Sequence, residues 1–235
     1  MRKYVLLFFA LFLIFGCSLN GRSAIPNYTN KFGKAVGSTV LLAGIIADEK
    51  AGHGTAVAIG WKDGLTQFLT AGHVCSMIQR LEMVGGYGLL EDYQGENALA
   101  TIVDIEFNNQ ITLGTDYCLV EAELDVPLAP LKNPNTIYGA EVYTIGAPYG
   151  MYPAPSSGHI MSAMKKRLLV SLNVGQGSSG AGIWQNGYVV GIITEAYAEG
   201  QFPGEGHVSH FGYAIPIGDI KAFLVANKIS WIGTI

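Results

Sequence analysis

Charged side chains are scarce in this sequence. Lys, Arg, Asp and Glu make up 14% of its 235 residues, and the formal net charge at pH 7 is −4. Because nucleic-acid binding relies on an excess of Lys and Arg to neutralise phosphates, the composition argues against a nucleic-acid partner. The hydrophobic fraction of 49% excludes disorder over most of the length and supports one sizeable core or two small ones.

No hydrophobic run at the N-terminus is long enough to be a comfortable membrane span. The apolar run 4–15 follows Arg2 and Lys3, whereas a span needs about 20 apolar residues. This layout is typical of a secretory signal peptide, so we expect the protein to be exported to the cell envelope. Residues 18–35 are polar and unpatterned, and we expect them to form a tether to a folded domain over 36–235.

The signal segment ends in "IFGC", which resembles the lipobox of bacterial lipoproteins. The resemblance implies that residues 1–17 contain the signal and that Cys17 carries a lipid that anchors the protein to a membrane. Phe15 is bulkier than the residue usual at that position. An ordinary cleaved signal and an uncleaved anchor are the alternatives.

Cysteines are few, at three. If Cys17 is lipidated, Cys75 and Cys118 remain as an even pair in a compartment that permits disulfides. The alternative is that each is a small buried hydrophobe. The sequence leaves both possibilities open.

Helical periodicity is also scarce. Glycine accounts for 31 residues, scattered among runs rich in Val, Ile, Thr and Tyr, which indicates an all-β protein with many turns. Two strand sets, at about 36–125 and 139–216, predict two small β-barrels or sandwiches, and a single helix is predicted over 217–228. The strands are expected at 38–47, 54–61, 67–71, 98–107, 116–124, 141–146, 157–163, 167–173, 181–185, 188–194 and 208–215.

Three polar positions stand out against this apolar background. His73 follows the strand in "FLTAGHVC", Asp116 opens the strand in "TDYCLVEAE", and Ser179 lies in "GQGSSGAGIW". A Gly/Ser run can be a flexible linker. It can also be a tight turn in which Ser179 attacks a carbonyl, His73 takes its proton and Asp116 orients the imidazole. In that turn the N–H groups of Gly177 and Ser179 would form the oxyanion hole.

In this order and context the sequence resembles the chymotrypsin-type (trypsin-like) serine peptidases, and most closely their bacterial high-temperature-requirement branch. The motifs that carry the resemblance are "GHGTAVAI", "FLTAGHV", "DYCLVEAELDVPLAPL", "YTIGAPYG", "SSGHIMSA", "GSSGAGIW", "VVGIITEA" and "GYAIPIGDIKAFL". The resemblance implies two perpendicular six-stranded β-barrels, a catalytic triad of His73, Asp116 and Ser179 in the cleft between them, and an endopeptidase acting on proteins or peptides without metal or organic cofactor. We expect the PDZ modules of that branch to be missing, since nothing like a peptide-binding module follows Leu224.

The resemblance also suggests which residues select the substrate. Asn173, six residues before Ser179, is expected near the base of the primary specificity pocket, and Thr194 and Glu195 are expected beside the substrate groove. An amide at the pocket base does not neutralise a cation, so we expect cleavage after small or medium uncharged residues.

Several alternatives compete with this interpretation. Ser178 is a second possible nucleophile, and "HVSH" at 207–210 could form a metal site with His53, although a solvated loop is the simpler interpretation. Cys75 and Cys118 lie outside glycine turns, which argues against cysteine nucleophiles. An α/β-hydrolase would need the reverse order of serine, acid and histidine. A catalytically inactive, protease-like binding protein of the cell envelope is the alternative from another functional class.

Overall fold

The computed structural model describes residues 32–108, 115–136, 138–164, 166–196 and 210–235. The expected lipidation site Cys17 therefore lies outside the described residues. The first described element is helix α2 (Phe32–Ser38), in which Ala35 and Val36 are buried. Folded structure thus includes residues 32–35, which the sequence had assigned to the tether. Within the described ranges, no helix has the length and apolar character needed to cross a membrane.

The first β-barrel is closed and antiparallel. Its six strands follow the order β1-β4-β5-β6-β3-β2, and pairing of β1 with β2 closes it. The bounds are β1 (Thr39–Ile46), β2 (Glu49–Lys62), β3 (Leu65–Thr70), β4 (Tyr87–Glu91), β5 (Asn97–Phe107) and β6 (Asp116–Ala122). A short strand near the C-terminus, β14 (Ser230–Trp231), adds to the outer side of β2.

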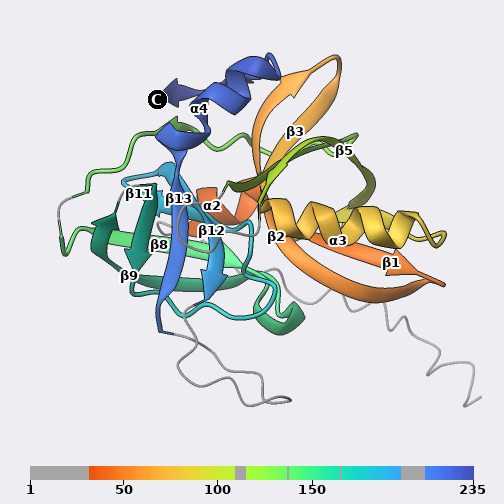
Figure 1. The fold of residues 1–235 in the computed structure, drawn as a ribbon, viewed down its shortest axis with the longest axis horizontal. Helices are drawn as coiled ribbons and strands as arrows, with labels where there is room; N and C mark the ends of the chain where they lie inside the picture. Colours follow the sequence, from red (N-terminus) through yellow and green to blue (C-terminus); the bar gives the residue numbers. More distant parts are fainter. Residues whose placement is uncertain (1–31, 109–114, 137, 165, 197–209) are drawn as a thin grey trace, which may run out of the picture.

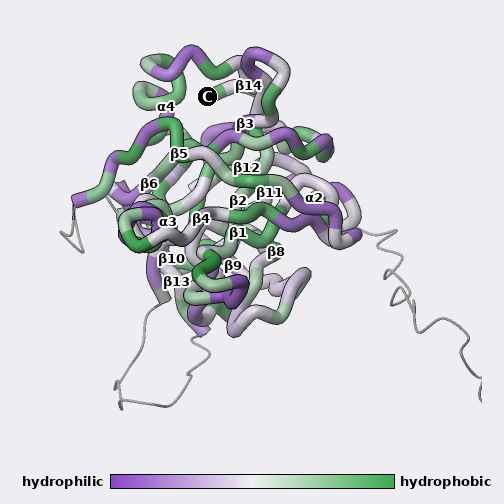
Figure 2. Tube along the Cα trace, turned by 90° about the vertical axis from the view of Figure 1, so that its right-hand side faces the viewer, coloured by the Kyte–Doolittle hydropathy of each residue, from purple (hydrophilic) through white to green (hydrophobic). Residues whose placement is uncertain are grey.

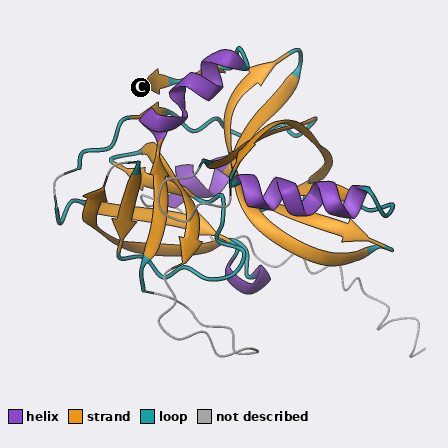
Figure 3. Cartoon of the chain, in the orientation of Figure 1, coloured by secondary structure: helices purple, strands orange, loops and turns teal. Residues whose placement is uncertain are grey.

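The second barrel is also closed. Its strand order is β11-β8-β9-β10-β13-β12, closed by pairing of β11 with β12. The bounds are β8 (Glu141–Gly146), β9 (Ala154–Met164), β10 (Arg167–Val170), β11 (Gly182–Gln185), β12 (Tyr188–Ala196) and β13 (Gly212–Pro216). The short β7 (Leu131–Lys132) pairs in parallel with β12, and β15 (Gly233–Thr234) pairs with β7. The prediction of two six-stranded barrels is confirmed (Figures 1 and 3).

The helices agree with the sequence only in part. Helix α4 (Ile217–Ala226) confirms the predicted C-terminal helix, with Ile220 and Phe223 buried. Helix α3 (Gly72–Glu82) was not predicted, and it lies along the first barrel in Figure 3. Its buried Val74, Cys75 and Ile78 follow a helical spacing. The short β4 was also missed, whereas the other strands of both barrels overlap their predicted ranges.

The two barrels share one hydrophobic core cluster. Val57 and Leu69 of the first barrel belong to the same buried cluster as Trp184 and Ile192 of the second, and Phe223 of α4 joins them. Figure 2 shows hydrophobic stretches along strands of both barrels. Because apolar surface is buried across the seam, the barrels are held together and the strand ends that meet there are fixed relative to one another.

Candidate active site

A histidine and an aspartate meet in the first barrel, where strand β3 ends and strand β6 begins. His73 is the second residue of α3, directly after β3, and Asp116 opens β6. The antiparallel pairing of Thr70 with Cys118 brings these two ends together. The Oδ1 of Asp116 accepts a hydrogen bond from the His73 backbone N–H at 2.8 Å, and Oδ2 lies 2.9 Å from His73 Nδ1.

The double hydrogen bond fixes the chemistry of the imidazole. An ionised carboxylate only accepts hydrogen bonds, so Nδ1 carries the proton and Nε2 of the neutral ring is left as a proton acceptor. The Asp116 side chain is 12% exposed and that of His73 is 37% exposed. The carboxylate is therefore largely shielded while the ring remains accessible.

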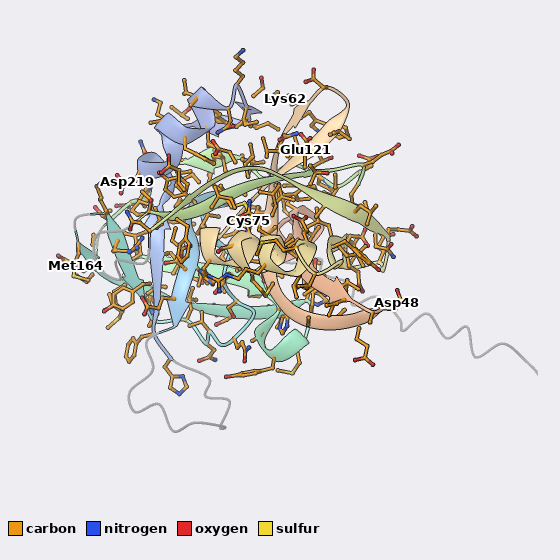
Figure 4. The ribbon with its side chains drawn as sticks, turned by 45° about the vertical axis from the view of Figure 1, so that its right-hand side comes forward. Asp48, Lys62, Cys75, Glu121, Met164 and Asp219 are labelled. Carbon is orange, nitrogen blue, oxygen red and sulfur yellow. A yellow bond between two sulfur atoms is a disulfide. The ribbon has the colours of Figure 1, made fainter. Side chains whose placement is uncertain are left out.

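A disulfide ties together the same two elements. It joins Cys75 of α3 to Cys118 of β6, each two residues beyond the histidine or the aspartate, with the Cα atoms 6.4 Å apart. Both cysteines are fully buried. Cys75 is labelled near the middle of the molecule in Figure 4. The bridge thus fixes α3 against β6 within two residues of both His73 and Asp116.

The candidate serine lies in a tight loop of the second barrel, residues 175–181, which we call the serine loop. Gly177 and Gly180 both have positive φ, +96° and +89°. A Cβ at Gly180 would lie 1.9 Å from the Thr55 carbonyl oxygen, and one at Gly177 would lie 2.3 Å from the Ala147 carbonyl oxygen. Only glycine fits at either position, so the run is a packed turn and not a flexible linker.

The two serines of this loop are placed differently. Ser178 is 3% exposed, and its Oγ accepts a hydrogen bond from the Gly175 N–H at 3.1 Å. Its own N–H donates to the Gly175 carbonyl at 2.9 Å, which closes the turn. Ser179 is half-buried. The Ser178 hydroxyl is therefore used inside the loop, which favours Ser179 as the serine available to a substrate.

The serine loop packs against the chain that flanks His73. A Cβ at Gly54 would lie 2.7 Å from the Val74 side chain and 3.1 Å from the Ser179 carbonyl oxygen, and one at Gly180 would lie 3.1 Å from the Ala71 nitrogen. Within the described structure, the Ser179 hydroxyl makes no hydrogen bond to the His73 ring. Catalytic hydrogen bonds of free enzymes often form only once substrate is bound.

The predicted specificity residues differ in burial and in their contacts. Asn173 is exposed, and its Oδ1 lies 2.8 Å from His210 Nδ1, so the side chain is engaged at the surface. Thr194 is 6% exposed. Burial raises the pKa of Glu195, and the guanidinium of Arg167 acts in the opposite direction. Residues 197–209, which follow β12, lie outside the described residues.

The pKa of Glu195 also depends on the charges of His73 and Asp116. The negative charge of Asp116 further raises the pKa of Glu195, and His73 lowers it. Burial lowers the pKa of Arg167, while Asp116 and Glu195 raise it. Because the pKa of Arg167 is lowered on balance, the carboxylates offset only part of the cost of desolvating this buried cation.

The histidines considered as metal ligands do not form a site in the described residues. His53 Nε2 lies 3.1 Å from the Ala147 carbonyl oxygen, whereas His210 contacts Asn173. His207 lies outside the described residues. In the described ranges, no three His, Cys, Asp or Glu side chains lie close enough together to hold a metal ion.

Comparison with known proteins identifies a family for this chain. The model of the trypsin-like peptidase domain matches residues 54–192, more than half of the chain. No curated protein matches the chain.

Solved structures with the same fold include several proteases. A serine endoprotease from Yersinia pestis is 21% identical, with a TM-score of 0.65 over 86% of this chain and 68% of that one. A serine-to-alanine variant of the HtrA-type protease AlgW, solved with a decapeptide, is 17% identical, with a TM-score of 0.63 over 86% of this chain and 67% of that one. The same variant with a tripeptide is 19% identical, with a TM-score of 0.63 over 86% and 64%. This chain therefore belongs to the family of trypsin-like peptidases, which are serine endopeptidases.

Proposed function

We propose that this protein hydrolyses peptide bonds with Ser179 as nucleophile, His73 as general base and acid, and Asp116 as the residue that orients the histidine. The observation that carries the proposal is the pair of hydrogen bonds that Asp116 accepts from the backbone N–H and the Nδ1 of His73. It leaves Nε2 as the proton acceptor and holds the ring in one orientation beside the chain that packs on the serine loop.

The reaction follows from these positions. Ser179 Oγ attacks the substrate carbonyl carbon as its proton passes to His73 Nε2, and the Asp116 carboxylate stabilises the resulting imidazolium. The tetrahedral intermediate collapses, and His73 returns the proton to the departing amine. Water then attacks the acyl ester on Ser179 while His73 Nε2 takes its proton. His73 returns that proton to Ser179 Oγ as the ester bond breaks, which releases the acid product and restores the free enzyme.

The developing negative charge needs hydrogen-bond donors that are not already used. Within the part of the chain that the structure describes, the N–H groups of Gly177 and Ser179 donate to no protein acceptor. Their neighbours in the loop are used, since Ser178 N–H donates to Gly175 and Ala181 N–H donates to Ser178. This supports the assignment of the oxyanion hole to Gly177 and Ser179, where one donor contributes about 3–4 kcal/mol in serine proteases.

The test is labelling with a serine-directed fluorophosphonate, followed by mapping of the labelled peptide. We expect one label, on Ser179, and hydrolysis of a casein substrate that Ser179→Ala and His73→Ala both abolish. A protein that binds casein but neither labels nor cleaves it would be an inactive, protease-like binding protein. A label on Ser178 would show that the nucleophile is misassigned.

We further propose that the protein is exported and anchored to a membrane by a lipid on Cys17. The support is the basic, apolar and "IFGC" pattern of residues 1–17. Cys17→Ala should move the protein from the membrane fraction to the soluble fraction. Mass spectrometry of the mature N-terminus is decisive, because an unmodified first residue other than Cys17 contradicts lipidation.

A further inference from the structure

We propose that Thr55 of the first barrel is the positioning residue that holds the serine loop, and with it the oxyanion hole, in its working shape. The inference rests on the proposed function, because it assigns a role to Thr55 in that same site. Thr55 lies in β2, is fully buried, and does not belong to the triad.

Thr55 donates hydrogen bonds to two carbonyl groups of the serine loop. Its hydroxyl donates to the Gly177 carbonyl at 2.8 Å, and its backbone N–H donates to the Ser179 carbonyl at 2.8 Å. These two carbonyls belong to the residues on either side of Ser178. One residue of the first barrel therefore fixes two peptide groups of the second barrel, next to the N–H groups assigned to the oxyanion hole.

The direction of the Thr55 hydroxyl is itself fixed. Its oxygen accepts a hydrogen bond from the Ala147 N–H at 3.1 Å, so its single proton is directed to the Gly177 carbonyl. The Ala147 carbonyl in turn accepts from His53 Nε2 at 3.1 Å. The Thr55 carbonyl accepts from the Thr70 hydroxyl at 2.7 Å. Thr55 is thus held from both barrels.

The serine loop needs such an anchor because of its composition. Gly177 and Gly180 lack a Cβ, so steric exclusion alone leaves their backbone free to adopt many conformations. Peptide groups are planar, so a rotation that moved the Gly177 carbonyl would also turn the N–H of Ser178 and shift the neighbouring groups. The hydrogen bonds from Thr55 remove that freedom.

The anchor also couples the two halves of the site. His73 follows β3 of the first barrel, whereas Ser179 belongs to a loop of the second. The pairing of Val57 with Leu69 links Thr55's own strand to β3. Hydrogen bonds from Thr55 to the serine loop therefore set where Ser179 lies relative to His73, as well as the shape of the oxyanion hole.

The experiment compares three variants with the wild type in hydrolysis of p-nitrophenyl acetate and in the rate of fluorophosphonate labelling. Thr55→Val keeps the shape of the side chain and removes the hydroxyl, while Thr55→Ser keeps the hydroxyl. Thr66→Val is the matched control, because the Thr66 hydroxyl is also buried and donates to a backbone carbonyl, that of Leu124, at 2.7 Å.

We expect Thr55→Val to lose about 100-fold in kcat with little change in KM, since a displacement of about 1 Å in a catalytic group costs this much. Thr55→Ser should remain within a few-fold of wild type, and Thr66→Val should keep the wild-type kcat. The melting temperature should fall further in Thr55→Val than in Thr66→Val, because the Thr55 hydroxyl makes two buried hydrogen bonds and the Thr66 hydroxyl donates one.

Three results would overturn the inference: wild-type kcat in Thr55→Val, a loss in Thr66→Val as large as that in Thr55→Val, or failure of Thr55→Ser to restore activity. Each of these three results is a comparison with the wild-type enzyme, so each can be obtained only if the wild type is active. A wild-type protein that neither labels nor hydrolyses the ester would overturn the proposed function itself, and the role of Thr55 with it.

Discussion

Removal of the Cys75–Cys118 disulfide should destabilise the protein strongly. The bridge closes a loop with a sequence separation of 43. In the chain-entropy description, such a cross-link lowers the entropy of the unfolded chain by about 13 cal/mol/K, equivalent to about 4 kcal/mol at 25 °C. The double variant Cys75→Ala/Cys118→Ala should therefore lose about 4 kcal/mol in the free energy of unfolding, a large part of the ordinary stability of a domain, roughly 5–15 kcal/mol.

The assay is urea denaturation of the oxidised wild type, the double variant, and the wild type in excess reductant. Both alanines replace buried side chains, so the double variant also loses some packing, whereas the reduced wild type does not. A loss below about 1 kcal/mol in both samples would refute the argument from loop closure. Two free thiols in a non-reducing mass measurement would show that the bridge is absent from the purified protein.

Three further predictions concern the substrate, pH and activation. A library of peptides with all 20 residues before the cleaved bond should show no preference for Lys or Arg, and a dominant basic signal would mean that Glu195 lines the pocket. Burial raises the pKa of Glu195 in the folded state above its ordinary value of 4.5. Its contribution to stability is therefore present at low pH and is lost as pH rises through the raised pKa. Glu195→Gln should flatten the melting-temperature profile above pH 4.5, and identical profiles would contradict this. Since uncharged Ser178 bonds to Gly175 inside the loop, residues 22–235 with an arbitrary N-terminal extension should be active without trimming; activity that appears only after cleavage to one defined N-terminus would count against this.

The parts of the fold that local pattern determines could be predicted from the sequence. The strands on both sides of His73 and Ser179 consist of alternating apolar and polar residues or of continuous apolar residues, and glycine turns separate them. These strands appear in the structure within a few residues of the expected bounds. Helix α3 was missed although Val74, Cys75 and Ile78 carry a helical spacing, because the run directly follows a strand and its apolar residues also suit a continuation of that strand. β7, β14 and β15 have two residues each, and only tertiary pairing defines them.

The candidate site shows the same division. The sequence places a histidine, an acid and a serine in order, but it says nothing of Thr55, because a buried threonine in a strand has no pattern of its own. Its partner Gly177 is 122 residues away in the chain. The pairing of Cys75 with Cys118 likewise depends on a Cα separation of 6.4 Å, a tertiary distance.

The two short strands at the C-terminal end have a consequence for the order of folding. β14 pairs with β2 of the first barrel, and β15 pairs with β7, which pairs with β12 of the second. The Leu131 N–H also donates to the Ile232 carbonyl at 2.6 Å. Residues 230–234 therefore form a strap across both barrels. In a chain that emerges N-terminus first, every barrel strand is present before this strap, so the strap can form only after all the strands that it fastens have been synthesised.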